Sequence, residues 1–249
     1  SLSYRLIALQ RKSDTQVDYV PDDRSLIAPS LSWTGEDLRI DLSYQYKTFS
    51  TPVDRGTVLI GDRVANTRYN QQFGETWAKS EGTDQIASAR LEYQLDPAWK
   101  TRVSYSWTQE TYDFAEAIPT AGQPNLATTG TLRRRANGAE YNNQVQYLAW
   151  DWIGDTRLLG QQHDLLIGLD HERVENVRGD TYRGTTNNDG LNIYNPNYGS
   201  LAESRELSTV QSDRTERVQS TSLYAKDNWH LNNQWILVLG GRYQRYDQY

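Results

Sequence analysis

The alternation of apolar and polar residues on both sides of Pro97 most limits what this chain can fold into. Successive side chains of a β-strand point to opposite faces of the sheet, so each alternating run has one apolar and one polar face. Before the turn the apolar row is Ala87, Ala89, Leu91, Tyr93 and Leu95. After the turn it is Trp99, Thr101, Val103, Tyr105 and Trp107. The two runs predict an antiparallel hairpin with an aromatic-rich apolar face and a charged face.

Three further hairpins show the same design. Their apolar rows are Ile27, Pro29, Leu31 and Trp33 with Leu38, Ile40, Leu42, Tyr44 and Tyr46; Val145, Tyr147 and Ala149 with Leu165, Ile167 and Leu169; and Leu223 and Ala225 with Trp235, Leu237, Leu239 and Tyr243. With an opening run at residues 3–10, we expect about nine strands of about 10 to 14 residues, whereas strands of globular proteins have about 5 to 6. Tilted membrane-spanning strands need about 9 to 11 residues. A soluble sandwich shows the same alternation, but these lengths favour the wall of a barrel.

The predicted connections are short at one end of the strands and long at the other. The short turns are at 34–37, 96–98, 154–161 and 231–233, and the long loops are at 11–25, 49–83, 112–138 and 176–216. Short periplasmic turns and long extracellular loops are typical of outer-membrane β-barrels, and tryptophans near the strand ends suit the lipid interface. The sequence therefore predicts an all-β chain that is part of a large transmembrane β-barrel.

Composition excludes several other classes of protein. Cysteine is absent, which removes disulfides, thiolate zinc sites and cysteine nucleophiles. The net charge of −6 does not suit a nucleic-acid binder, and no apolar run approaches the length of a transmembrane helix. The three histidines show no metal-ligand spacing, and adjacent strand residues such as Asp170 and His171 point to opposite faces. We predict no enzyme activity, no metal site and no cofactor.

Both ends of the chain lie in predicted strands, and the predicted strand count is odd. Bacterial single-chain barrels have even strand numbers, and an open sheet edge cannot face lipid. We therefore expect residues 1–249 to be a piece of a larger barrel domain.

Eight segments resemble, in the same order along the chain, the barrel of TonB-dependent ferric-siderophore receptors, most nearly the ferrichrome and ferrioxamine type. They are residues 4–9 (YRLIAL), 14–20 (DTQVDYV), 23–33 (DRSLIAPSLSW), 52–57 (PVDRGT), 160–170 (GQQHDLLIGLD), 192–199 (NIYNPNYG), 224–229 (YAKDNW) and 237–243 (LVLGGRY). The resemblance implies a bacterial outer-membrane transporter that binds a ferric siderophore, of the hydroxamate type, and imports it with energy supplied by TonB. It also implies an N-terminal plug domain, a TonB contact and further strands, which we expect to lie outside residues 1–249.

The resemblance also implies a ligand vestibule beyond the strand ends. Tyrosine and tryptophan offer large contact areas with few rotatable bonds, and arginine can pair with oxygen atoms around a metal. The positions that align with this vestibule are Arg55, Tyr112, Phe114 and Tyr182, with Tyr69 and Trp77 as further loop aromatics. Arg55, in Asp54-Arg55-Gly56, stands where the family has an aromatic pair.

Charged residues on the polar faces are expected to pair with one another or with the plug. The run Arg133-Arg134-Arg135 is a candidate contact for lipopolysaccharide phosphates, beside the expected contact with outer-membrane lipid. Two other functions fit the strand pattern: a passive porin, and another surface protein such as a secreted β-rich passenger. The turn and loop asymmetry speaks against the passenger, and the order of the segments speaks against the porin.

Overall fold

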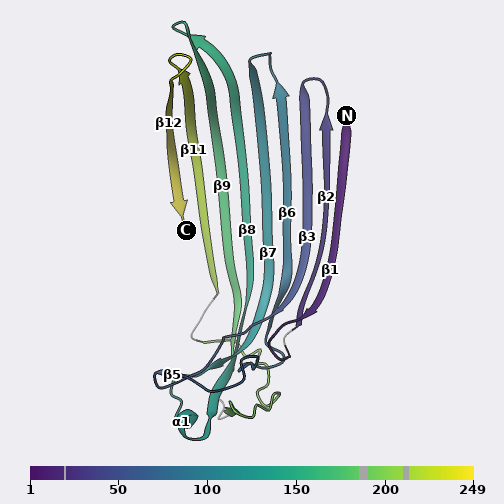
Figure 1. Cartoon of the computed structure of the whole chain (residues 1–249), viewed down its shortest axis with the longest axis vertical. Helices are drawn as coiled ribbons and strands as arrows, with labels where there is room; N and C mark the ends of the chain where they lie inside the picture. Colours follow the sequence, from purple (N-terminus) through teal and green to yellow (C-terminus); the bar gives the residue numbers. More distant parts are fainter. Residues whose placement is uncertain (20, 185–189, 210–212) are drawn as a thin grey trace.

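One antiparallel sheet forms nearly the whole structure (Figure 1), a computed structural model that describes residues 1–19, 21–184, 190–209 and 213–249. In this part of the chain, nine long strands pair in the order in which they occur. They are β1 (Leu2–Asp14), β2 (Pro21–Thr34), β3 (Leu38–Pro52), β6 (Lys79–Gln94), β7 (Trp99–Pro119), β8 (Thr131–Leu158), β9 (Gln161–Arg183), β11 (Arg214–His230) and β12 (Ile236–Gln248). The short elements are β4 (Leu59–Ile60), β5 (Arg63–Val64), α1 (Leu126–Thr129) and β10 (Gly190–Asn192). The prediction of an all-β chain with about nine antiparallel strands is confirmed.

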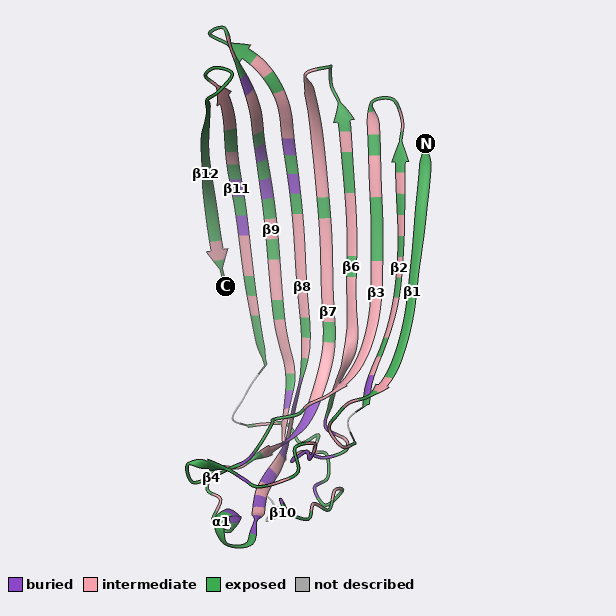
Figure 2. Ribbon diagram, viewed as in Figure 1, coloured by how far each residue is buried: buried purple, intermediate pink, exposed green. Residues whose placement is uncertain are grey.

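The sheet is open. Among the described residues, β1 pairs only with β2 and β12 pairs only with β11, so each has one free edge. Figure 2 shows both strands as almost wholly exposed. Further strands on both sides would be needed to close such a sheet into a barrel, since an open edge leaves backbone groups without partners.

Tight turns join the strands at one end, the upper end in Figure 1. In two of them an Asx side chain holds the turn: the Asp96 carboxylate accepts from the amides of Ala98 and Trp99 at 2.8 and 2.9 Å, and Asn232 plays the same part in the last turn. The turn predicted at 154–161 was too long: β8 continues to Leu158, and only Leu159 and Gly160 form the turn, both with positive φ. Positive φ at both positions matches the right-handed twist of the flanking strands.

The predicted strand and loop lengths were wrong at the other end. The strands have 13 to 28 residues, and β7 pairs with β8 without interruption from Trp99 opposite Gly154 to Pro119 opposite Arg134. The predicted loop 112–138 is therefore mostly strand. The backbone pairing of β7 with β8 continues past the last lipid-facing side chains. The apolar alternation in the sequence therefore ends before the two strands do. Val20 in the predicted loop 11–25, and residues 185–189 and 210–212 in the predicted loop 176–216, lie outside the described residues.

One face of the sheet exposes rows of large apolar side chains. Leu42, Ala89, Tyr105 and Leu148 lie in register across β3, β6, β7 and β8, and the three large ones are 40 to 44% exposed. A contiguous apolar surface of this kind suits lipid rather than water. We call it the apolar face, and the opposite one, which carries Arg102, the polar face.

The apolar row predicted for β8 was wrong. Val145, Tyr147 and Ala149 lie on the polar face, where Ala149 stands opposite Asp170. The apolar face of β8 carries Trp150, which pairs with Leu169 of β9. Both alternating rows of β8 contain apolar residues, so only the register with β9 decides between them.

The apolar core lies in the loops rather than in the sheet. Buried apolar side chains from three separate segments pack together at the loop end of the sheet, where Figure 2 also shows buried positions. They are Val58, Ala65, Phe73, Leu126, Leu132, Leu191 and Ile193. We call this assembly the loop core. In the described part of the chain, no helix is long and apolar enough to cross a membrane.

Candidate functional site

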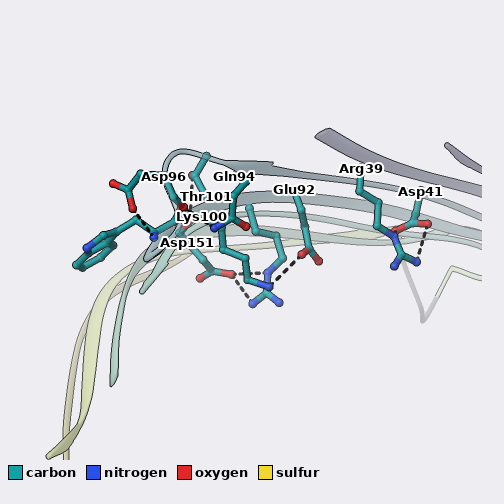
Figure 3. A network of polar contacts seen from close by, with 10 residues as sticks. Arg39, Asp41, Glu92, Gln94, Asp96, Lys100, Thr101 and Asp151 are labelled. Carbon is teal, nitrogen blue, oxygen red and sulfur yellow. Dashed lines mark hydrogen bonds and ion pairs between the residues drawn. The ribbon is translucent and has the colours of Figure 1, made fainter. Parts of the chain in front are cut away.

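Charged side chains on the polar face pair with one another near the turn end of the sheet (Figure 3). The Arg102 guanidinium donates to the Asp151 carboxylate at 2.8 and 3.0 Å across β7 and β8. Lys100 approaches Glu92 at 3.3 Å across β6 and β7. Figure 3 shows Glu92, Lys100 and Asp151 on the side toward which the sheet curls. The expected pairing of these charges is confirmed, and mutual neutralisation suits a structural role.

Asp170 and His171 point to opposite faces, as predicted. The Asp170 carboxylate pairs with Arg242 on the polar face at 2.9 Å, and Nδ1 of His171 lies 2.9 Å from the hydroxyl of Thr221. Among the described residues, no group of three or more histidine or acidic side chains could hold a metal ion.

Four aromatic side chains gather on the polar face at the loop end of the sheet. Tyr112 stacks on Tyr141 with ring centroids 5.0 Å apart and planes 12° apart. Phe114 lies 6.1 Å from Tyr141, and Phe49 lies 6.5 Å from Tyr112. Tyr112 and Phe114 follow Arg102 in steps of two along β7, which places them on the same face. We call these four residues the aromatic group.

Sequence reasoning found two members of this group and missed Phe49 and Tyr141. Tyr141 stands directly opposite Tyr112, but only the register of β7 against β8 shows this. Phe49 continues the polar row of Lys47, with which it also makes a cation–π contact at 5.3 Å. The alternation of polar and apolar residues could have identified Phe49, because an aromatic residue that continues a polar row lies on the polar face and does not face lipid.

A hollow of about 380 Å³ lies beside the aromatic group. Its walls are Tyr112, Tyr141, Asn143, Asn176, Val177, Arg178, Arg214 and Glu216. Aromatic rings, amides and guanidinium groups together can hold a compact ligand that has an apolar shell and oxygen atoms at its surface.

The structure brings Arg55 to the same region. Its Nε donates to Oε2 of Glu116 at 2.6 Å, and Glu116 lies two residues beyond Phe114 on the same face of β7. Nδ2 of Asn137 donates to the other oxygen of Glu116 at 3.0 Å. Glu116 is only 2% exposed, so the guanidinium charge of Arg55 offsets a buried carboxylate.

Tyr182 does not join the aromatic group. The register between β8 and β9 shifts at Ala139 and Tyr141, so that Tyr182 pairs with Gly138 and points to the other face. There its hydroxyl donates to the Glu140 carboxylate at 2.8 Å. This hydrogen bond to a carboxylate raises the pKa of Tyr182 to about 12.

Two other predicted ligand contacts, Tyr69 and Trp77, lie in the connection between β3 and β6. Tyr69 is 90% exposed, whereas Nε1 of Trp77 donates to the carbonyl of Leu201 at 2.8 Å. Arg134, the middle residue of the basic run, is fully buried against Glu75. Arg134 therefore cannot contact a lipopolysaccharide phosphate, because its guanidinium is buried in the ion pair with Glu75.

Comparison with known proteins identifies the family of this chain. The profile described as "TonB dependent receptor-like, beta-barrel" matches residues 27–249. The metal-pseudopaline receptor CntO of Pseudomonas aeruginosa is 28% identical over 99% of this chain and 34% of its own length. The ferrioxamine receptor of Yersinia enterocolitica is 25% identical over 98% of this chain and 34% of its own length. This chain thus spans about a third of the length of each of these relatives.

Solved structures show the same fold. The Pseudomonas aeruginosa ferripyoverdine receptor bound to ferripyoverdine superimposes with a TM-score of 0.86 at 15% identity, over 100% of this chain and 33% of that one. The Escherichia coli ferric-catecholate import receptor Fiu in its open form gives 0.84 at 19% identity, over 99% of this chain and 40% of that one. Members of this family are outer-membrane transport receptors for siderophore ligands, not enzymes, and need no cofactor. The chain belongs to the TonB-dependent receptor family and forms part of its outer-membrane β-barrel.

Proposed function

We propose that this chain supplies part of the barrel wall and of the ligand vestibule of a receptor that imports a ferric siderophore of the hydroxamate type. The observation that carries the proposal is the stacking of Tyr112 on Tyr141 on the polar face at the loop end. A ferric trihydroxamate is a compact, nearly uncharged complex with an amphipathic shell, and flat aromatic rings cover such a shell at little cost in conformational entropy. Ferrioxamine receptors among the relatives support this ligand class.

The remaining parts of the receptor belong to the same proposal. The free edges of β1 and β12 would pair with further barrel strands, and a plug domain would fill the space on the polar face. Energy for import would come from TonB acting on the plug. Lipid would cover the apolar face, and lipopolysaccharide would surround its loop end.

The test measures ligand binding by the full-length receptor in detergent. Replacing Tyr112 and Tyr141 together by alanine is expected to weaken binding of ferric ferrioxamine B by about tenfold or more, because stacked aromatic anchors carry much of the binding energy in such sites. The matched control is Tyr93→Ala, which removes a half-exposed tyrosine on the apolar face at the turn end of β6 and is expected to leave affinity unchanged. Equal affinities for the double variant and the control would contradict the proposal.

A passive porin predicts a different result in cells. Uptake by a TonB-driven receptor saturates with ligand concentration and stops when TonB is removed. Uptake through a porin rises in proportion to concentration and does not depend on TonB.

A further inference from the structure

Two arginines lie just beyond the aromatic group, where the polar rows of β8 and β9 end. Asn137, which holds Glu116, stands directly opposite Arg183, and Arg135 is the next residue on the same face of β8. Arg183 is thus one alternation step, about 7 Å along the strands, beyond the level at which Phe114 pairs with Ala139.

Both arginine side chains are half-buried, and neither forms an ion pair with a carboxylate of the described residues. The Nε atoms of Arg135 and Arg183 are buried without a hydrogen-bond partner. Within the described residues, no carboxylate lies within 4.0 Å of either guanidinium, although the chain as a whole is acidic. Burial, and the positive charge of Arg183 nearby, lower the pKa of Arg135 from its usual value.

Two carboxylates of this region are engaged elsewhere: Glu116 pairs with Arg55 and Asn137, and Glu203 pairs with Arg205 at 2.8 Å. The carbonyl of Glu206 accepts from the amide of Arg183 at 2.9 Å, but the Glu206 carboxylate forms no ion pair with the Arg183 guanidinium. Two adjacent, partly desolvated cations that no carboxylate of the described residues neutralises attract an anion from solution. The planar guanidinium forms two parallel hydrogen bonds to a carboxylate, which makes this anion the best match.

We propose that Arg135 and Arg183 bind a carboxylate-bearing arm of the siderophore while the aromatic group holds the body of the ferric trihydroxamate. This inference rests on the proposed function and narrows its substrate class to chelates that carry a free carboxylate. The distance of about one alternation step suits an arm of a few bonds.

The experiment compares two ferric complexes that differ only in one end group. One is a linear trihydroxamate that ends in a free amine, and the other is the same molecule with the amine succinylated, so that it ends in a carboxylate. The full-length receptor is expected to bind the carboxylate form about tenfold more tightly, the size of one charge-assisted interaction. The preference should shrink as salt concentration rises.

Variants assign the preference to the two arginines. Arg135→Gln with Arg183→Gln is expected to weaken binding of the carboxylate form by about tenfold, and to strengthen binding of the amine form because the repulsion between cations is removed. Arg135→Lys with Arg183→Lys keeps the charge and should retain part of the preference. The control is Arg63→Gln, since the side chain of Arg63 is 88% exposed in β5 and should not alter the preference.

The outcomes separate this inference from the function on which it rests. Equal binding of both complexes by the wild type, or an unchanged preference in the glutamine variant, would overturn the arginine assignment and leave hydroxamate binding standing. If the glutamine variant binds both ferric complexes more weakly and to the same extent, the two arginines have a structural role instead. Failure of the wild type to bind either complex would overturn the hydroxamate function and this inference with it.

Discussion

The Arg134 guanidinium and the Glu75 carboxylate form an ion pair of 2.7 Å in which neither side chain is exposed to solvent. Nη1 of Arg134 also donates to the carbonyl of Gly74 at 2.6 Å, and the amide of Gly199 donates to Oε2 of Glu75 at 2.6 Å. The pair therefore ties three segments together: the start of β8, the connection between β3 and β6, and the segment that follows β10.

We expect Glu75→Ala to loosen the loop core. The variant leaves the Arg134 charge buried without its carboxylate, which costs about 3 to 5 kcal/mol when one partner of a buried pair is removed. Limited proteolysis of the folded receptor should then cut within residues 53–78 and 190–209 much faster than in the wild type. Asp62→Asn, at an acidic residue whose side chain is 95% exposed in the same connection, should leave the cleavage rate unchanged. Equal cleavage rates for Glu75→Ala and Asp62→Asn would show that the ion pair between Arg134 and Glu75 does not hold the loops together.

The ion pair between Arg55 and Glu116 gives a second prediction. Arg55→Gln leaves the carboxylate of Glu116, which is 2% exposed, with Asn137 as its remaining partner. We expect a loss of about 1 to 3 kcal/mol in the free energy of unfolding, less than for a fully buried pair because Arg55 is partly solvated. Adding Glu116→Gln removes the buried charge and should restore most of the stability. Urea unfolding of the four proteins in this cycle measures the coupling, and additive losses would exclude it.

Gly168 allows Tyr224 and Asp151 to meet on the polar face, where the tyrosine hydroxyl donates to the carboxylate at 2.5 Å. A Cβ at position 168 would lie 2.5 Å from Cζ of Tyr224 and 2.6 Å from Oδ1 of Asp151. Gly168→Ala should therefore break this hydrogen bond and lower stability by about 1 to 3 kcal/mol. Thermal unfolding should show a lower midpoint for Gly168→Ala than for Gly240→Ala, whose new Cβ has its nearest neighbour 3.6 Å away. A midpoint equal to that of the control would mean that the side chains shift without cost.

Tyr182 gives a prediction for pH. Its hydrogen bond to Glu140 favours the neutral phenol and raises the pKa to about 12, from an ordinary value of 10.0. Because the folded pKa is the higher one, the contact stabilises the end of β9 fully below pH 10 and is lost as the pH rises toward 12. The difference in tyrosinate absorbance between wild type and Tyr182→Phe should titrate near pH 12, and Glu140→Gln should move this midpoint down. A midpoint near 10 in the wild type would contradict the hydrogen bond.

The pairing of the strands was largely predictable from the sequence, and the site only in part. Lipid on one face and polar contacts on the other impose a period of two, which placed Leu42, Tyr105 and Leu223 on the apolar face correctly. The same rule failed for β8, since both of its rows contain apolar residues. Tyr112 and Phe114 were predicted as vestibule residues, but their partners Phe49 and Tyr141 depend on which strands lie side by side and in what register.

The amino-acid sequence by itself determined the class of the fold, its two faces and the positions of its tight turns. Each of these follows from contacts between near neighbours in the chain or from the solvent that alternate residues meet. Only the tertiary structure decided that β7 and β8 continue past the apolar rows, that a bulge turns Tyr182 away from the aromatic group, and that Arg134 is buried against a residue 59 positions away. Those outcomes depend on register and on packing between distant segments, and no local pattern of residues encodes them.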